Sequence, residues 1–259
     1  MANCLCGAKR SVPLSYPCLQ KTIFITGTGT GAGKTVLTAL LASYLTGQKI
    51  RVAAFKPVSS GGRADARALL AAMNASAPTW SADVSAHSKS IGALTLDEIN
   101  PWYFRAAIAP VLAARREKKP VTLAPVLAHI RAVRRNFAVT LVEGAGGLLS
   151  PIGEDFDSRD LILALRAAPV IVAPNQLGVV NHLRLTLEAL PDNYRAQAKI
   201  VLMSPAKPDS ATKTNAQLLG EFFPPERIFP LPWLGKQFSL ETAQKTSQVR
   251  RTLAALVKD

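Results

Sequence analysis

Cysteine is scarce in this sequence, and the three that occur, Cys4, Cys6 and Cys18, all stand within the first 18 residues. The rest of the chain offers no disulfide framework, which favours a reducing compartment, and we expect the cytoplasm. No uninterrupted apolar run approaches the roughly 18 residues that a membrane span needs, so we expect no membrane partner. The interleaving of aromatic and basic residues that is typical of single-strand nucleic-acid binders is also missing.

Acidic residues are few beside the basic ones. The chain has 31 Lys and Arg against 17 Asp and Glu, which gives a formal net charge of +14. Such a balance raises the question of nucleic acid. The charge is spread along the chain, however, and its densest stretch, 105–135, is best interpreted as a solvated helix face. We therefore expect no nucleic-acid partner, with a patch for an anionic ligand or a partner as the alternative.

The composition is otherwise that of a folded protein, with 48% hydrophobic and 19% charged residues over 259 positions. Residues 1–20 show no periodicity, and we expect a disordered extension there. Beyond them, short β-rich runs alternate with helical patterns, which predicts an α/β fold with a doubly wound, mostly parallel sheet and helices on both faces. We expect a single domain over 21–235 and a helical tail, 236–259, packed on it. Strands are expected at 22–26, 50–55, 139–142, 170–173 and 199–203, helices at 34–46, 65–73, 106–118, 122–136, 179–190 and 239–257, and a loop insertion at 75–93.

A glycine-rich turn between the first strand and the first helix, Gly27 to Thr35, matches a phosphate-binding loop. In such loops backbone amides and a helix N-terminus hold phosphate oxygens. Lys34 would reach the β- and γ-phosphates, and the Thr35 hydroxyl would coordinate Mg²⁺. Five residues, rather than the usual four, separate Gly27 from Gly33. The motif predicts a P-loop NTPase-like domain that binds a magnesium nucleotide.

Three further residues follow predicted strands, where ligands of parallel sheets bind. Glu143 closes a strand and precedes a second glycine-rich loop, so it stands where a metal-binding acid would. Asp65 opens a helix, where it is either a second magnesium ligand or a helix cap. Lys56 ends the second strand before Pro57, where it either neutralises charge during phosphoryl transfer or lies on the surface. No Ser-His-Asp or Cys-His set indicates a protein nucleophile.

Taken in order, the motifs resemble one known family, the dethiobiotin synthetases, over about 21–235. The longer phosphate loop is that family's form, and two motifs are its most specific marks. The motifs are Thr26-Gly-Thr-x-Thr-x-x-Gly-Lys-Thr35, Lys56-Pro-Val-x-Ser-Gly61, Asp65-Ala-x-x-Leu69, Asn100-Pro-x-x-Phe104, Val142-Glu-Gly-Ala-Gly-Gly147, Leu177-Gly-x-x-Asn-His182 and Pro232-Trp-Leu234. The specific ones begin at Lys56 and at Leu177.

The resemblance implies an ATP- and Mg²⁺-dependent carboxylation in a homodimer. The diamine 7,8-diaminononanoate takes up CO₂ as a carbamate, ATP converts this to a carbamic-phosphoric anhydride, and ring closure gives dethiobiotin. By position, Lys34 and Lys56 would be catalytic, and Thr35, Asp65 and Glu143 would hold the metal. Substrate binding would fall to Ser60, Leu177, Gly178 and Asn181. Nucleotide binding would fall to Gly31, Ala32, Gly33, Lys34, Thr35, Val36, Glu143, Gly144, Ala145, Gly146, Ser204, Pro232, Trp233 and Leu234.

The chain departs from the family pattern at several places. Gly29 and Gly31 stand where acids are common, and Ser204-Pro205 replaces an Asn-Asp pair that reads adenine. Two other functions remain as alternatives. One is a related P-loop ligase acting on another acid. The other is a partitioning-type ATPase switch, whose hallmark lysine at the start of the phosphate loop is missing here.

Overall fold

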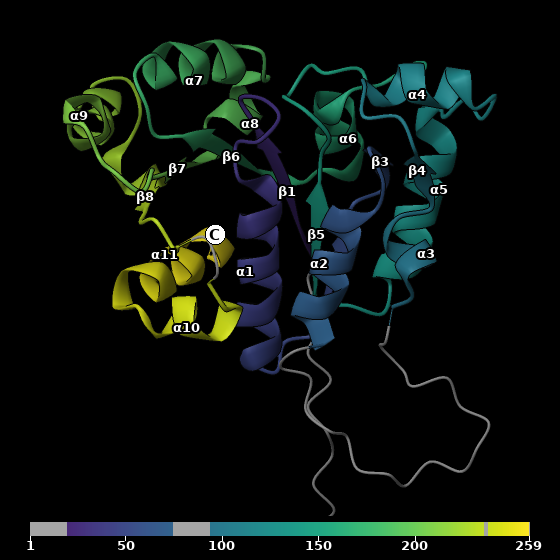
Figure 1. Cartoon of the computed structure of the whole chain (residues 1–259), viewed down its shortest axis with the longest axis horizontal. Coiled ribbons are helices and arrows are strands. Elements are labelled where there is room, and N and C mark those ends of the chain that lie inside the picture. Colours follow the sequence, from purple (N-terminus) through teal and green to yellow (C-terminus); the bar gives the residue numbers. More distant parts are fainter. Residues whose placement is uncertain (1–19, 75–93, 236–237, 259) are drawn as a thin grey trace, which may run out of the picture.

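The computed structural model describes residues 20–74, 94–235 and 238–258, so the expectations for the first 19 residues and for 75–93 lie outside the described residues. Six strands form one parallel sheet in the order β2-β5-β1-β6-β7-β8 (Figure 1). Their bounds are β1 Lys21–Gly27, β2 Val52–Phe55, β5 Val139–Glu143, β6 Ala168–Pro174, β7 Lys199–Met203 and β8 Ile228–Leu231. A second, two-stranded parallel sheet pairs β3 Val58–Ser60 with β4 Trp102–Phe104.

Helices cover both faces of the main sheet, because successive side chains of a buried strand point to opposite sides. Ile23 and Ile25 of β1 pack in one buried cluster with the helices α1, α2, α3, α10 and α11, whereas Phe24 packs in another with α4 to α7 and α9. The longer helices are α1 Lys34–Gly47, α2 Ala64–Asn74, α5 Leu123–Arg134, α6 Ser158–Leu165, α7 Val179–Glu188, α9 Ser210–Leu219 and α11 Ser247–Val257. The shorter ones are α3 Leu96–Ile99, α4 Pro110–Arg116, α8 Asp192–Arg195 and α10 Leu240–Lys245. This is a doubly wound P-loop NTPase-like fold in one domain.

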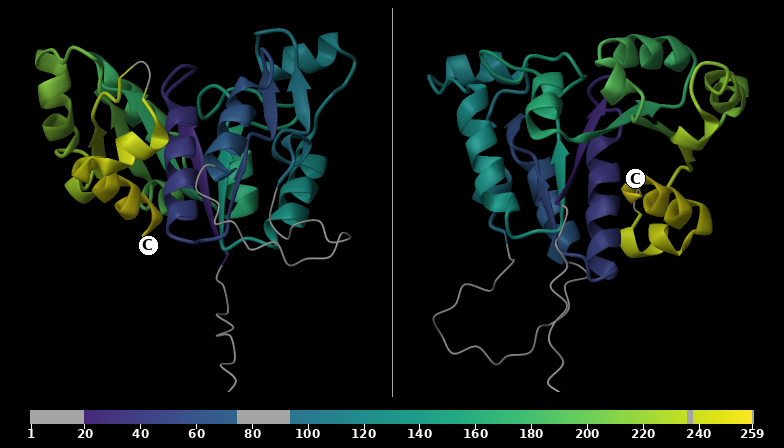
Figure 2. Two further views of the ribbon diagram at one scale, coloured as in Figure 1. Left: turned by 60° about the horizontal axis from the view of Figure 1, so that its bottom comes forward. Right: turned by 180° about the vertical axis from the view of Figure 1, so that it is seen from behind.

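The last two helices lie beside α1, on the side away from α2 (Figures 1 and 2). Lysines at the start of two strands hold the end of α11. Lys21 Nζ donates to the carbonyl oxygen of Val257 at 2.8 Å, and Lys199 Nζ donates to that of Ala255 at 2.9 Å. The last carbonyls of a helix have no partner within the helix, so these cations satisfy groups that would otherwise need water.

Some elements differ from those expected. A single helix was predicted over 239–257, but Thr246 adopts an extended conformation with ψ of 122° and separates α10 from α11. The second strand begins at Val52 rather than Ile50, because the Ile50 amide bonds to Leu45 O and completes the turn after α1. The helix expected from 106 begins at Pro110, which has no amide proton and suits a first helical turn. Among the described residues, no helix has the length and apolar character to cross a membrane.

Candidate active site

The phosphate loop joins β1 to α1, and two of its glycines, Gly31 and Gly33, adopt positive φ angles that other residues avoid. Gly33, directly before α1, has φ of 98°, and a Cβ at this position would meet the Met203 side chain at 2.9 Å. The next residue, Lys34, is 6% exposed. Its Nζ donates to the carbonyl oxygens of Gly29 at 2.8 Å and Gly146 at 2.7 Å. Lys34 therefore links the phosphate loop to the loop after β5.

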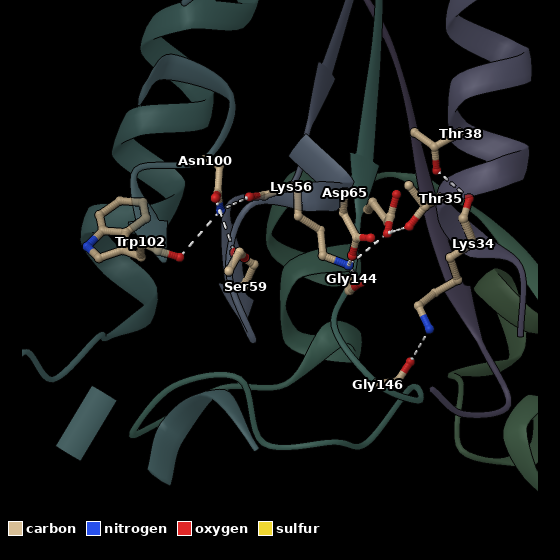
Figure 3. Close-up of polar contacts among 12 residues, drawn as sticks. Lys34, Thr35, Thr38, Lys56, Ser59, Asp65, Asn100, Trp102, Gly144 and Gly146 are labelled. Atoms are coloured by element: carbon tan, nitrogen blue, oxygen red, sulfur yellow. Dashed lines mark hydrogen bonds and ion pairs between the residues drawn. The ribbon is translucent and has the colours of Figure 1, made fainter. Parts of the chain in front are cut away.

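Glu143, at the end of β5, is the centre of the site. Its Oε1 accepts hydrogen bonds from Thr35 Oγ1 and from Lys56 Nζ, each at 2.7 Å. The Lys56 ammonium also donates to the Gly144 carbonyl at 3.0 Å and lies 3.1 Å from Asp65 Oδ2. Figure 3 shows Thr35, Lys56 and Asp65 converging from α1, the end of β2 and α2. These polar residues thus meet at the edge of the sheet where the parallel strands have their carboxyl ends.

The two lysines differ in their electrostatic surroundings. Burial and the charge of Lys56 lower the pKa of Lys34 to about 8, against the opposing effect of Glu143 and Asp65. Burial also disfavours the charge of Lys56, but the two carboxylates and their hydrogen bonds outweigh it and raise its pKa above the usual lysine value. Lys56 therefore keeps its charge more firmly than a free lysine, whereas Lys34, with a pKa of about 8, loses its proton more readily.

The residues around Glu143 fit a magnesium ion. Glu143 Oε2 is buried and has no hydrogen-bond partner among the described residues. Thr35, Asp65 and Glu143 together provide a hydroxyl and two carboxylates, which are the hard oxygen ligands that Mg²⁺ takes together with phosphate oxygens. The described residues hold no cluster of three or more His, Cys, Asp or Glu suited to a metal. Mg²⁺ does not need such a cluster when a nucleotide completes its coordination.

The residues expected to bind substrate lie outside this bonded cluster. Ser60 ends β3 and is half-buried. Leu177 is 82% exposed, Gly178 has φ of 87° and caps α7, and Asn181 is exposed in its first turn. No hydrogen bond or ion pair described in the structure joins these four residues to Lys56 or Glu143.

The residues expected near the nucleotide base also stand apart. Ser204 follows β7, and its amide donates to Leu231 O at 2.9 Å. Pro232, Trp233 and Leu234 follow β8 and line a cavity of about 430 Å³ shared with the start of α10. Trp233 is 50% exposed.

The cluster bonded around Glu143 therefore contains Lys56 and the three predicted metal ligands, whereas Lys34 bonds to the neighbouring loop carbonyls of Gly29 and Gly146. Around them lie the phosphate loop with the first turn of α1 and the loop after β5. These segments comprise Gly31, Ala32, Gly33, Lys34, Thr35 and Val36, and Glu143, Gly144, Ala145 and Gly146.

No role of its own was predicted for Asn100, although it belongs to the Asn100-Pro-x-x-Phe104 motif. Asn100 is fully buried, and its Nδ2 donates to the main-chain oxygen of Lys56 at 2.7 Å. The signal available was a polar residue between the apolar Ile99 and Pro101. Its partner lies 44 positions earlier, so only the fold reveals the contact.

Comparison with known structures supports the fold. The structure of pNOB8 ParA bound to nonspecific DNA superposes with a TM-score of 0.53 at 14% identity, over 92% of this chain and 98% of that chain. At this identity the likeness concerns the fold alone.

Comparison of sequences is more specific. A family model described as an AAA domain matches residues 21–237. The ATP-dependent dethiobiotin synthetase of Bacillus licheniformis is 33% identical over 88% of this chain and 89% of its own length. That of Bacillus subtilis strain 168 is 32% identical over 93% and 94%, and that of Anaeromyxobacter sp. strain Fw109-5 is 35% identical over 73% and 79%. The chain belongs to the dethiobiotin synthetase family of P-loop proteins.

Proposed function

We propose that this protein forms dethiobiotin from 7,8-diaminononanoate, CO₂ and ATP in biotin synthesis. The observation that carries the proposal is the cluster in which Glu143 joins the phosphate-loop residue Thr35 to Lys56. Together with Lys34 beside it, the cluster combines a phosphate-binding loop, two lysines and two carboxylates, and these residues include no activated nucleophile. Such a site suits a reaction in which both reacting groups belong to the substrates.

The reaction has three bond-making steps. One amine of the diamine takes up CO₂ and loses a proton, which gives a carbamate. A carbamate oxygen attacks the γ-phosphorus of ATP, the bond to the β-phosphate oxygen breaks, and ADP leaves. The second amine attacks the carbon of the carbamic-phosphoric anhydride, phosphate leaves with the electrons of the broken C–O bond, and loss of another proton completes the cyclic urea.

Negative charge on the carbamate, the transferred phosphoryl group and the leaving phosphate is what the two lysines would stabilise. Lys56 is buried and held in place by carboxylates that raise its pKa and favour its charged form, so it can stabilise the carbamate and the transferred phosphoryl group. Lys34 lies on the phosphate loop and would bind the β- and γ-phosphates. Thr35, Asp65 and Glu143 would hold Mg²⁺, which supplies positive charge at the phosphate oxygens when bound with ATP.

The remaining substrate contacts are assigned by position. Ser60 would contact the diamine, and the exposed start of α7, with Leu177, Gly178 and Asn181, would bind its carboxylate through helix-terminal amides. We propose a homodimer with the substrate near the subunit boundary, where Leu177, which is 82% exposed in the single chain, would be covered.

We assign the base of ATP to the segments that follow β7 and β8. Gly31 to Val36 and Glu143 to Gly146 would contact the phosphates, and Ser204 with Pro232, Trp233 and Leu234 would flank the base. The cavity of about 430 Å³ beside Trp233 supports this place for an aromatic ring.

Two alternatives use the same cluster. A related ligase acting on another acid would keep the phosphate loop and change the substrate residues, but 33% identity over 88% of the chain to a dethiobiotin synthetase favours the diamine. A partitioning-type switch shares the fold at 14% identity and would transfer phosphate to water. We place the proposed reaction in the cytoplasm, where the diamine's biosynthesis would supply it.

The test is product formation by the full chain. Protein is incubated with ATP, Mg²⁺, bicarbonate and 7,8-diaminononanoate, and the products are identified by mass. The proposal requires dethiobiotin, with one ADP and one phosphate for each molecule formed. ATP hydrolysis that proceeds at the same rate without the diamine, and with no dethiobiotin, would favour the switch instead.

A further inference from the structure

Asn100 is a polar residue buried in the apolar region beside the active site. It follows α3 with φ of −140° and ψ of 73°, and it is 0% exposed. A buried amide side chain is tolerated when its donors and acceptor are used, because a buried polar group without a partner destabilises the fold. The question is therefore which groups this side chain serves.

The side chain holds the backbone of Lys56. Asn100 Nδ2 donates to Lys56 O at 2.7 Å, with a longer contact to Trp102 O at 3.4 Å, and Oδ1 accepts from Ser59 Oγ at 3.1 Å. On the other side of the same residue, the Lys56 amide donates to Ile99 O at 3.1 Å. Both main-chain polar groups of Lys56 are thus bonded to residues 99 and 100.

A side chain performs this role because the backbone cannot continue it. The ladder of β2 ends at Phe55, and the small sheet of β3 and β4 starts at Val58. Between these two ladders, Lys56 is followed by Pro57 and Asn100 by Pro101. Main-chain hydrogen bonds cross this gap on either side, from the Lys56 amide to Ile99 O and from the Trp102 amide to Pro57 O at 3.2 Å. Pro101, between Asn100 and Trp102, has no amide proton to donate, so the Asn100 side chain donates to the Lys56 oxygen instead.

Arg63 fixes Asn100 from the opposite side. One of its terminal nitrogens, Nη2, donates to Asn100 O at 2.9 Å and to Leu96 O at 2.6 Å, and the other, Nη1, lies 2.8 Å from Asp97 Oδ1. The guanidinium carbon also stacks 4.2 Å from the centre of the Tyr103 ring. Arg63 directly precedes α2, whose second residue is the Asp65 that pairs with Lys56.

We propose that Asn100 is a positioning residue for Lys56, acting through the Lys56 main chain. It fixes the point from which the lysine side chain extends toward Glu143, while Arg63 ties the same segment to the helix that carries Asp65. This inference rests on the proposed function, in which the Lys56 ammonium faces the transferred phosphoryl group. Misplacement of a charge by about 1 Å can cost roughly 100-fold in rate, so a modest shift of the Lys56 backbone matters.

The test compares two substitutions with a control. Asn100→Asp keeps the shape but replaces the Nδ2 donor by an acceptor, and Asn100→Ala removes the side chain without burying a charge. Val249→Ala, in the buried face of α11, is the control because it lowers the melting temperature without touching Lys56. The steady-state constants kcat and KM for ATP are measured well below the melting temperatures.

A second readout needs no activity. Lysine modification by an amine-reactive reagent is followed by mass spectrometry in the ligand-free protein. Lys56 is 5% exposed, so it should react slowly in the unchanged protein. When its backbone is released, the Lys56 rate should rise several-fold relative to the exposed lysines.

The proposal expects kcat to fall about 10- to 100-fold in the Asn100 variants, with KM for ATP within about threefold, and Lys56 labelling to accelerate. Val249→Ala should change neither. Asn100 variants that match the control in kcat and in Lys56 labelling would overturn the proposal, as would equal acceleration of labelling in the control. Absence of dethiobiotin formation by the unchanged protein would instead refute the proposed function, and the labelling result would still decide the role of Asn100.

Discussion

The pKa of Lys34 near 8 makes ATP binding sensitive to pH in a range that is easy to measure. Below pH 8 the ammonium is charged before the nucleotide arrives. Above pH 8 Lys34 is mostly neutral in the free protein, so it must take up a proton from solution before its ammonium can bind the phosphates. Affinity should therefore be constant at lower pH and should fall as pH rises through 8.

The magnitude follows from the same value. One pH unit above the pKa only about a tenth of the protein carries the charge, so the dissociation constant should rise roughly tenfold, or about 1.4 kcal/mol. Lys56 adds nothing to this slope, because its carboxylate partners raise its pKa and keep it charged across the range.

Calorimetric titration with ATP in excess Mg²⁺, from pH 6.5 to 9.5 at constant ionic strength, measures the effect. Lys34→Arg is the matched variant, since a guanidinium stays charged throughout and should give a flat profile at whatever affinity it retains. An affinity of the unchanged protein that stays constant up to pH 9.5 would refute the reasoning about burial and the neighbouring charge of Lys56.

Three further substitutions or comparisons test the site. Lys56→Ala should lower kcat by roughly 10²–10³-fold while the fold is retained. Lys119→Ala, which changes an exposed lysine, should leave kcat unchanged. Near-normal turnover by Lys56→Ala would show that Lys56 has no part in phosphoryl transfer. Asp65→Asn should weaken Mg²⁺ binding and so raise the Mg²⁺ concentration needed for activity. An unchanged Mg²⁺ requirement would support a simple helix cap, because Asn caps a helix as well as Asp does. ATP should be preferred over CTP and GTP by less than about 1,000-fold in kcat/KM. Ser204 offers the base one small hydroxyl, because its amide is already bonded to Leu231 O, and Pro205 has no amide proton to donate. A larger preference for ATP would mean that other groups recognise the base.

The fold could be predicted where strands are apolar and uninterrupted. The run from Lys199 to Met203 is a strand with the expected bounds, and Lys34 opens the expected helix. The short strands β3, β4 and β8 were missed because they have three or four residues, and β8 contains Pro230, which an edge strand tolerates. Local patterns carry too little information for elements of that length.

The site could be predicted in part for a topological reason. Lys56 directly follows β2, Glu143 ends β5, and Thr35 lies in the first turn of α1, after the loop that leaves β1. Parallel strands bring their carboxyl ends to one edge of the sheet. The sharing of one carboxylate oxygen by Thr35 and Lys56 is a tertiary contact that no spacing reveals. The hydrogen bond from the Asn100 side chain to the main-chain oxygen of Lys56 likewise depends on how α3 packs beside β2.

The measurement that tests the central claim most directly follows an oxygen atom. The protein is incubated for a short time with ¹⁸O-labelled bicarbonate, Mg²⁺, ATP and the diamine, and the released phosphate is analysed by mass. Attack of the carbamate on ATP carries an oxygen from CO₂ into the phosphate, so we expect one ¹⁸O in the phosphate for each dethiobiotin formed. Phosphate without the label, formed at the rate of ATP consumption, would mean that water is the acceptor and would contradict the account.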